Sequence, residues 1–570
     1  MKPHLSRVLA AAGPALPRTV AALAIALLAG ACAIAPPAVA PLELRLIAFN
    51  DFHGQTETPP AGWMVPDATA PGGQTRVGVG GVAHLATAIR ELRAGKANSI
   101  VVGAGDLVSA SPLVSALFFD EPAITALGEA GLELSAVGNH EFDRGRDELL
   151  RLVSGGCHPK EGCLAGPWTG ARFGYVAANI VDTATGRTLF PPYAIKHYED
   201  VPIAFVGATL RSTPTIVDRR GIRGLEFRDE AESVNALVPE LRRQGVEAIV
   251  LLIHEGGAST GGFDDPACPG FSGPIVEIVK RLDAAIDVVV SGHTHQAFRC
   301  RVDGRLVTSA GSYGRLVTTI DIAIDRTSKD VLRADARNIL IETSRFAPDP
   351  AIATLVDRYA KLAAESAGRV VGTIQGEFTP LADRAGESNL GDLVAQAQLT
   401  AMREATGAQI AFTNPGGLRA PLASRRADGG VTFGDLFAVQ PFGNTLVAVT
   451  LTGAQVLRLL EQQWRNPPDR TRILPVAGLA YAWDGSRPLG NRVVPGSVTV
   501  DGRPLETGAD YRVAMNSFLF EGGDGFAVFS EGRDPTGGPG DLAAFARFVA
   551  AKPRFAKVPE GRIRRVDAAP

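Results

Sequence analysis

Short apolar runs rich in β-branched residues recur five times in the first half of the chain, and polar residues follow each one. The runs cover residues 44–49, 100–102, 134–137, 248–253 and 286–290. Asp, Asn or His comes soon after every run, mostly with glycine beside it. Such runs are typical of buried strands, and α/β sheets place their ligands at the carboxyl ends of strands. The pattern therefore predicts one sheet whose successive strand ends present polar side chains to a single cleft.

The last run leads into two histidines, His293 and His295, one residue apart. Alternate residues of a strand point the same way, so we expect the two imidazoles to converge on one point. Converging imidazoles bind transition metals when they are neutral, and glycine beside a ligand lets the backbone come close to a metal or an anion. Polar caps on strands are the alternative for any single run. Five runs in order, holding five of the nine histidines, favour a shared metal site.

The second half of the chain begins with a helical pattern. Apolar residues stand at positions 352, 355, 356, 359 and 362, with Pro350 near the start. This spacing predicts a helix. We interpret it as a linker, with a new domain beginning near Val371. That domain carries short polar and glycine-rich motifs at residues 384–391, 414–419, 440–444 and 522–526.

Length and charge limit the class of protein. The chain has 570 residues, enough for two or three domains with large cores. It is 45% hydrophobic with a net charge of −3, so nothing indicates a surface for a polyanion. We therefore expect no nucleic-acid polymer as a partner, whereas a single nucleotide needs no basic patch.

The amino terminus carries an export pattern. Basic residues precede an apolar run at residues 20–31, which is typical of a secretory signal and too short to span a membrane. Residues 27–32 resemble a bacterial lipobox, which would put a lipid on Cys32. We therefore expect a signal peptide over residues 1–32, a tether over 33–41 and an exported bacterial protein, periplasmic or held at the outer membrane by its lipid alone. Cleavage after Ala40 is the alternative.

Four cysteines remain after Cys32 is set aside. Export permits disulfides, and four cysteines allow three pairings. Proximity in the sequence favours Cys157 with Cys163 and Cys268 with Cys300. A zinc site built on cysteines is the alternative, but the histidines are already assigned to the strand ends.

The strand-end motifs resemble those of the calcineurin-like metallophosphoesterases and, within them, the bacterial 5′-nucleotidase and UDP-sugar hydrolase family. The motifs appear in the family order as Asp51-Phe52-His53, Gly105-Asp106, Gly138-Asn139-His140-Glu141-Phe142-Asp143, His254 and Gly292-His293-Thr294-His295. The likeness runs from about Leu42 to Arg564. It implies an α/β chain with a four-layer metallophosphoesterase sandwich over residues 42–345, a linker helix over 346–370, and an α/β 5′-nucleotidase domain over 371–565.

The resemblance also implies a pair of metal sites that share one carboxylate. One ion would bind Asp51, His53, Asp106 and His295, and the other would bind Asp106, Asn139, His254 and His293. Nitrogen and oxygen ligands without a thiolate suit Zn²⁺, Mn²⁺ or Co²⁺. Two such ions clamp the attacking and leaving oxygens and make hydroxide available at neutral pH. His140 and Asp143 match the catalytic dyad of the family, with Asp143 orienting the ring.

The motifs of the second domain match the nucleotide-binding part of the family. By that match, Arg384 and Arg419 hold phosphate or carboxylate-like oxygens. Phe442 and Phe518 clamp a flat base, and Asn414 and Asp524 bind base or ribose hydroxyls. Pro380 stands where some members have a further arginine, which leaves the length of the phosphate chain open.

These residues predict an enzyme that releases phosphate from nucleoside 5′-monophosphates and from related nucleotides or UDP-sugars. Within hydrolases, the alternatives are a 2′,3′-cyclic-nucleotide phosphodiesterase with 3′-nucleotidase activity and a thiohydrolase of sulfur oxidation. A nucleotide-binding lipoprotein without activity is the alternative from another class. The presence of every expected metal ligand and of both dyad residues argues against it.

Overall fold

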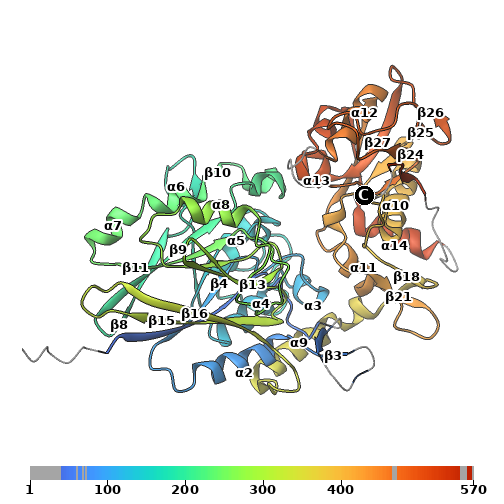
Figure 1. Cartoon of the computed structure of the whole chain (residues 1–570). Coiled ribbons are helices and arrows are strands. Elements are labelled where there is room, and N and C mark those ends of the chain that lie inside the picture. Colours follow the sequence, from blue (N-terminus) through green and yellow to red (C-terminus); the bar gives the residue numbers. More distant parts are fainter. Residues whose placement is uncertain are drawn as a thin grey trace, which may run out of the picture. The chain divides into compact units, whose positions relative to one another are not determined.

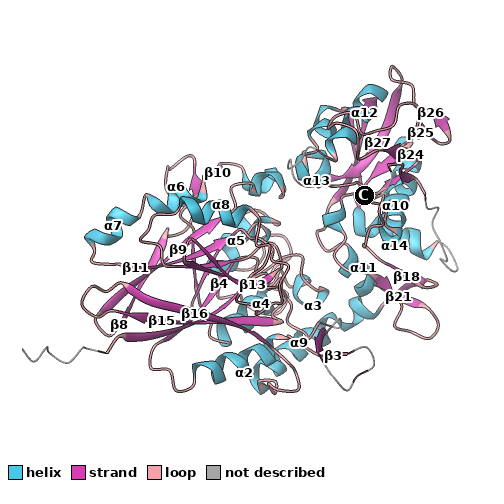
Figure 2. Cartoon of the chain, viewed as in Figure 1, coloured by secondary structure: helices cyan, strands magenta, loops and turns pink. Residues whose placement is uncertain are grey.

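Two six-stranded sheets pack face to face in the first half of the chain (Figures 1 and 2). The structure is a computed structural model that describes residues 40–59, 62–66, 70, 73–464, 471–551 and 561–567. The predicted signal peptide, the tether up to residue 39 and Cys32 lie outside the described residues. No helix in the described part of the chain is both long enough and apolar enough to cross a membrane.

The first sheet has mixed strand directions. Its order is β16 (Val331–Leu340), β15 (Leu316–Ile324), β1 (Leu42–Phe49), β4 (Ser99–Ala104), β5 (Leu134–Ala136) and β6 (Gly174–Val176). Strands β1, β4, β5 and β6 run parallel, and β15 and β16 are antiparallel to their neighbours. The carboxyl ends of β1, β4 and β5 therefore meet at one edge.

The second sheet has a parallel centre between antiparallel edges. Its order is β13 (Ala297–Val302), β14 (Arg305–Ala310), β12 (Val288–Ser291), β11 (Ala248–His254), β9 (Val201–Thr209) and β8 (Tyr193–Tyr198). Strands β14, β12, β11 and β9 are parallel, and β13 and β8 are antiparallel edges. The strands with ligands at their ends, β11 and β12, lie side by side at its centre.

Both faces of both sheets are buried, which explains the nearly continuous apolar runs. In β1, Leu44 and Leu46 face the second sheet, whereas Ile47 and Phe49 face the outer helices. The helices α2 (Val82–Arg93), α4 (Glu121–Glu129) and α5 (Arg146–Ser154) cover the first sheet. The helices α6 (Glu230–Asn235), α7 (Val238–Arg243) and α8 (Pro274–Arg281) cover the second. The result is the four-layer sandwich that the resemblance implied.

The helix predicted from the apolar spacing over residues 352–362 is present as α9 (Pro350–Gly368). Asp349 caps it by accepting the backbone N–H groups of Ala351 and Ile352, and Pro350 occupies the first turn. Ile352, Tyr359 and Ala363 are buried. Leu362 is 53% exposed, so this member of the predicted apolar face is not part of the core.

The second half of the chain is a three-layer α/β unit. Its main sheet has the order β23 (Val476–Ala477), β19 (Ile410–Phe412), β27 (Asp510–Asn516), β22 (Thr445–Thr452) and β28 (Arg533–Gly540). The helices α10 (Asn389–Thr406) and α14 (Asp541–Ala550) pack on one face, and α12 (Gly453–Gln462) packs on the other. The other α-helices of the described residues are α3 (Leu113–Ala116) in the first half of the chain, and α11 (Phe433–Val439) and α13 (Ser517–Phe520) in the second.

Smaller strand pairs complete the described residues. They are β2 (Trp63–Pro66) with β3 (Gln74–Val77), β7 (Ile180–Asp182) with β10 (Leu225–Phe227), β17 (Val370–Thr373) with β21 (Gly430–Thr432), and β18 (Glu377–Phe378) with β20 (Leu422–Ala423). A four-stranded sheet has the order β26 (Arg503–Pro504), β25 (Thr499–Val500), β24 (Leu479–Trp483) and β29 (Ile563–Arg565).

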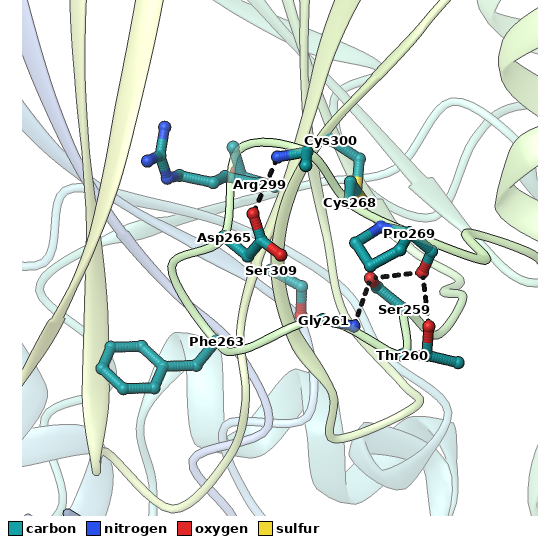
Figure 3. Close-up of a disulfide and its surroundings, with 12 residues drawn as sticks. Ser259, Thr260, Gly261, Phe263, Asp265, Cys268, Pro269, Arg299, Cys300 and Ser309 are labelled. Carbon is teal, nitrogen blue, oxygen red and sulfur yellow. Dashed lines mark hydrogen bonds between the residues drawn. A yellow bond between two sulfur atoms is a disulfide. The ribbon is translucent and has the colours of Figure 1, made fainter. Parts of the chain in front are cut away.

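Both predicted disulfides are present. Cys157 is bonded to Cys163 with Cα atoms 4.7 Å apart, and Cys268 is bonded to Cys300 with Cα atoms 5.4 Å apart. Figure 3 shows the second bond, which joins the loop between β11 and α8 to strand β13.

Candidate metal centre and adjoining cavity

Strand ends from both sheets converge on one buried group of ligands. The first sheet contributes residues after β1, β4 and β5, and the second contributes His254, the last residue of β11, and the histidines after β12. The prediction that one sheet supplies them all is therefore wrong. A buried apolar run has the same appearance in either sheet of a sandwich, because each sheet is covered on both faces.

The histidine pair also differs from its prediction. Strand β12 ends at Ser291, so His293 and His295 lie in the loop beyond it and do not project from a strand. Five of the expected ligands have left-handed backbone conformations: Asp51, His53, Asp106, His293 and His295, with φ between 49° and 71°. Such conformations are costly for residues other than glycine and concentrate at functional sites. Tight turns after the strands thus aim these side chains.

One half of the site contains Asp51, His53 and His295. The Nε2 atoms of the two histidines are 3.0 Å apart, and Asp51 Oδ1 is 3.3 Å from His295 Nε2. His53 Nδ1 lies 3.0 Å from the carbonyl oxygen of Ser109. Since a carbonyl can only accept, Nδ1 carries the proton and the lone pair of Nε2 points into the site.

The other half contains Asp106, His254, His293 and Asn139. Asp106 Oδ2 lies 2.9 Å from His254 Nε2 and 3.8 Å from His53 Nε2, so this carboxylate stands between the two halves. His293 Nδ1 is 3.1 Å from Asn139 Oδ1. His254 Nδ1 donates to the Ala104 carbonyl oxygen at 2.7 Å, which again turns Nε2 inward.

This set of donors fits divalent metal ions. Asp51, His53 and His295 lie close enough to share an ion, as do Asp106, His254 and His293. Nitrogen lone pairs facing each other and facing carboxylate oxygens repel unless a proton or a cation lies between them. Imidazole nitrogens with carboxylate and amide oxygens are the ligands that Zn²⁺, Mn²⁺ and Co²⁺ accept.

The electrostatics of the buried group favour ionised carboxylates. Burial favours the neutral forms, but the neighbouring histidines outweigh it and lower the pKa of Asp51 to about 2. For His254, burial is outweighed by Asp106, and its pKa rises to about 10. Burial and the nearby His254 lower the pKa of His293 to about 3. The carboxylates therefore stay ionised, and they attract a metal ion as they attract a proton.

Hydrogen bonds from nearby residues hold the carboxylates of the ligand group in place. The N–H of His293 donates to both carboxylate oxygens of Asp51, at 3.2 and 2.9 Å. The N–H of His140 donates to Asp106 Oδ1 at 2.8 Å. Asn50 donates to Asp51 Oδ2 at 2.6 Å and to the Gly311 carbonyl. The two sheets are thus joined through the site itself.

The glycines beside the ligands serve these close approaches between segments. A Cβ on Gly138 would overlap the Asp106 carboxylate, and one on Gly292 would lie 2.8 Å from the Ala104 carbonyl oxygen. A Cβ on Gly105 would lie 2.7 Å from both Gly138 N and His254 Nδ1. The sequence analysis explained these glycines by a close approach of the backbone to a metal or an anion. In the structure these glycines lie against the carboxylate of Asp106, the imidazole of His254 and neighbouring backbone atoms.

Glu141 is a functional candidate that the sequence reasoning passed over. Its Oε2 accepts the N–H groups of Asp106 at 2.9 Å and Gly138 at 2.6 Å, and its Oε1 accepts that of Leu107 at 2.7 Å. The carboxyl group is buried. Burial and the nearby Asp106 raise its pKa to about 7. Glu141 therefore fixes the turn that presents Asp106. Its place in the same short motif as Asn139 was the available signal.

His140 and Asp143 form the expected pair. His140 Nδ1 lies 2.7 Å from Asp143 Oδ2, within the turn that follows β5. Burial disfavours the charged ring, but Asp143 and Asp106 outweigh it, and the pKa of His140 is raised. The ring lies nearly parallel to that of Phe442, with centroids 5.7 Å apart.

A cavity of about 510 Å³ adjoins the metal-ligand group. Its wall includes His140, Asp143, Asn139 and His293 from the first half of the chain. The second half contributes five of the six predicted substrate residues: Asn414, Arg419, Phe442, Phe518 and Asp524. Arg384, the sixth, is exposed and is not among the lining residues.

The contacts of these residues fix their orientation. Asn414 Oδ1 accepts Asn516 Nδ2 at 2.8 Å, and the Arg419 guanidinium lies 5.7 Å from the centre of the Phe442 ring. Asp524 has φ of 54° in a tight turn and forms an ion pair with Arg472. Arg472 also lines the cavity. The sequence reasoning did not single it out, because it stands in no recognised motif.

Two family models match the sequence. The calcineurin-like phosphoesterase model matches residues 44–297, and the model of the 5′-nucleotidase C-terminal domain matches residues 370–531. Together they span the metal-ligand group and most of the cavity wall. The matches and the four-layer fold indicate the same family.

Similar proteins extend this result over most of the chain. An endonuclease of Bacillus subtilis is 31% identical over 532 residues, which cover 92% of this chain and 41% of that protein. The chain thus spans less than half of that relative. A cell wall protein of Listeria monocytogenes is 32% identical over 547 residues, covering 91% of this chain and 68% of that protein.

A solved structure with a similar fold is that of a 5′-nucleotidase precursor from Thermus thermophilus. It superimposes with a TM-score of 0.73 at 27% identity and covers 92% of this chain and all of that one. Sequence models, relatives and fold agree with the site geometry. The chain therefore belongs to the 5′-nucleotidase family of calcineurin-like phosphoesterases, a family of metal-dependent phosphoesterases.

Proposed function

We propose that this enzyme hydrolyses the phosphate ester of nucleoside 5′-monophosphates, with related nucleotides or UDP-sugars as further substrates. The observation that carries the proposal is the cavity, whose wall has metal-ligand candidates on one side and aromatic, arginine and amide side chains on the other. A nucleotide has the matching parts: a phosphate for the first side, and a sugar and a flat base for the second. The cavity has a volume of about 510 Å³, which is in the range of small-molecule sites.

Asp51, His53, Asp106 and His295 would hold one divalent ion, and Asp106, Asn139, His254 and His293 would hold the other. The position of Asp106 Oδ2 between His53 and His254 supports a shared carboxylate. Bound ions of this kind activate water at neutral pH and offset charge on phosphoryl oxygens. Zn²⁺, Mn²⁺ and Co²⁺ are the candidates for which the donor set is suited.

His140 would act directly on the phosphate. Asp143 holds its Nδ1 at 2.7 Å, so Nε2 is the ring nitrogen that can donate a proton to a phosphoryl or leaving oxygen. The raised pKa of His140, which Asp143 and Asp106 cause against the effect of burial, keeps that proton on the ring. Asp143 fixes the tautomer and the orientation of the ring.

The second half of the chain would bind the nucleoside. Arg419 offers its guanidinium to phosphate oxygens, and the rings of Phe442 and Phe518 offer faces for a base. Asn414 and Asp524 offer acceptors and donors for hydroxyl groups. Because Arg384 lies outside the cavity wall, a phosphate contact from it would need a different arrangement of the chain.

Three alternatives to this function use the same residue types. Hydrolysis of 2′,3′-cyclic nucleotides and removal of sulfate by a thiohydrolase are the enzymatic alternatives. The fold of a Thermus thermophilus sulfate thiohydrolase is similar, with a TM-score of 0.68, but at 19% identity this likeness concerns the fold alone. A binding protein without activity is the third alternative.

The deciding experiment is a substrate panel on metal-depleted protein, with Zn²⁺, Mn²⁺, Co²⁺ and Mg²⁺ added back singly. Phosphate release is measured for AMP and glycerol 3-phosphate. Consumption of UDP-glucose and 2′,3′-cyclic AMP is followed by chromatography, because their first hydrolysis gives phosphate esters and no free phosphate. We expect AMP to be the best substrate. The Asp106→Asn variant should lose activity on all of them. Activity that survives this change contradicts the shared carboxylate, and preference for the cyclic nucleotide contradicts the substrate.

A variant of the cavity wall tests the nucleoside site separately. Phe518→Ala removes one base-stacking face, which is worth about 1–3 kcal/mol, so KM for AMP should rise roughly tenfold. Glycerol 3-phosphate has no base, and its kcat/KM should stay within about twofold. Equal losses on both substrates would contradict a base clamp at this ring.

The cellular location remains part of the proposal. The two disulfides favour an oxidising compartment and support export to the periplasm or cell surface. We also propose, from the sequence alone, that Cys32 is lipidated and that residues 346–370 link two domains.

A further inference from the structure

A long loop leads directly from His254 to helix α8, over residues 255–273. Connections of this length need their own anchors to stay ordered. Its anchors lie at the far end from the metal ligands. Cys268 is bonded to Cys300 in β13 (Figure 3), and Arg299 Nε donates to the Asp264 carbonyl oxygen at 2.8 Å. Asn338 Nδ2 donates to the Phe263 carbonyl oxygen at 2.7 Å.

The interior of the loop is closed by its own hydrogen bonds. The hydroxyls of Ser259 and Thr260 both donate to the Pro269 carbonyl oxygen, at 2.9 and 3.0 Å (Figure 3). Ala258 and Ser272 form an antiparallel bridge. The anchored end is therefore connected rigidly to the base of the loop.

The base of the loop touches the segment between the two ligand histidines. Thr294 Oγ1 donates to the Gly257 carbonyl oxygen at 2.7 Å. The N–H of Gly292 reaches the Glu255 carbonyl oxygen at 3.4 Å. A Cβ on Gly256 would overlap the Gly292 carbonyl oxygen, so only glycine permits this approach.

We propose that the 255–273 loop and its Cys268–Cys300 disulfide are a positioning element for His293 and His295. The bond encloses the chain from residue 268 to residue 300, which contains both histidines. Thr294, which lies between the two histidines, fixes their position relative to the loop through its hydrogen bond to Gly257. The inference rests on the proposed metal site, and it adds that metal affinity in this enzyme depends on an oxidised cysteine pair outside the ligand set.

The test compares two disulfide variants of the full-length protein. Cys268→Ser/Cys300→Ser removes the proposed positioning bond, and Cys157→Ser/Cys163→Ser removes the other bond as a matched control. Mn²⁺ and Zn²⁺ titrations by calorimetry are run well below the melting temperature of each metal-free variant. We expect Kd to rise at least about tenfold in the first variant, as for other changes that disorient metal ligands. The control should stay within about twofold.

A milder pair of variants covers the case in which the first disulfide variant does not fold. Thr294→Val keeps the disulfide and the side-chain volume but removes the donor to Gly257, and we expect Kd to rise about threefold or more. Thr294→Ser keeps the hydroxyl and should bind metal as the wild type does. Saturating metal should restore much of the activity of Thr294→Val.

The outcomes separate this inference from the proposed function. A wild-type protein that binds neither metal contradicts both. If the wild type binds metal and Cys268→Ser/Cys300→Ser or Thr294→Val binds it equally well, the positioning role is wrong and the proposed function stands. If the metal-free variant has a lower melting temperature but an unchanged Kd, the disulfide stabilises the fold in general and does not position the metal ligands.

Discussion

Glu141 holds three backbone N–H groups from two segments, those around Asp106 and Gly138. Asp106 has a φ of 53°, a conformation that persists only where the surroundings determine it. The buried carboxylate supplies that determination, because both oxygens point at the turn. A single side chain thus sets the geometry of the one carboxylate that stands between the two halves of the site.

Replacing Glu141 by Gln should weaken metal binding. The amide keeps one acceptor and turns an NH₂ group toward backbone donors, so the turn at Asp106 loses its support. We expect Kd for Mn²⁺ to rise about 10- to 100-fold, measured by calorimetry. Glu230→Gln is the matched control, because Glu230 is also buried and accepts the N–H of Arg211. Equal affinities in the two variants would rule out the role given to Glu141.

At the scale of elements, helix α9 illustrates how far periodicity reaches. Its spacing identified the helix, and the cap at Asp349 fixed its beginning. Periodicity did not reveal that Leu362 lies in solvent. Tyr359 packs edge-on against Phe118, with ring centroids 4.9 Å apart, and Val114 and Ala363 complete the cluster. This aromatic cluster holds the middle of the helix, and Ile352 near its start packs into the core that covers the first sheet.

The two apolar positions of α9 should respond differently to truncation. Tyr359→Ala removes a buried ring and should destabilise the protein by roughly 3 kcal/mol. Leu362→Ala should change stability by less than about 0.5 kcal/mol, since the side chain is exposed. Thermal unfolding of both variants, compared with the wild type, measures the difference. Similar losses in melting temperature would mean that Leu362 is buried in solution.

At the scale of the whole molecule, the ligand group connects the two sheets of the sandwich. Each sheet supplies ligands, and backbone N–H groups of one sheet's loops donate to carboxylates from the other. Bound metal should therefore stabilise the sandwich as a whole, because it binds only where both sheets are in place.

Removal of metal should lower the melting temperature. A ligand present at about a thousand times its Kd contributes roughly 4 kcal/mol, so dialysis against EDTA should lower Tm by several degrees. Added Mn²⁺ or Zn²⁺ should restore it, as scanning calorimetry would record. In Asp106→Asn the shift should shrink. A wild-type Tm that ignores both chelator and metal would contradict a metal site between the sheets.

The sequence by itself determined the local elements of this protein and most of its chemistry. Apolar runs ending in Asp, Asn and His identified the strand ends, the apolar spacing from residue 352 to residue 362 identified helix α9, and nearness in sequence identified both disulfides. These features are encoded within a few residues, where periodicity and turn chemistry act.

Only the tertiary structure decided how the ligands meet. Two sheets supply the ligands, because covered strands have the same appearance in either sheet. Left-handed turns, not strand alternation, aim His293 and His295. The structure also shows that Glu141 supports the turn at Asp106, that Arg472 lines the cavity and that Arg384 does not. Each of these results depends on contacts between segments far apart in the chain. Side-chain type and spacing carry no record of such contacts, which arise from packing.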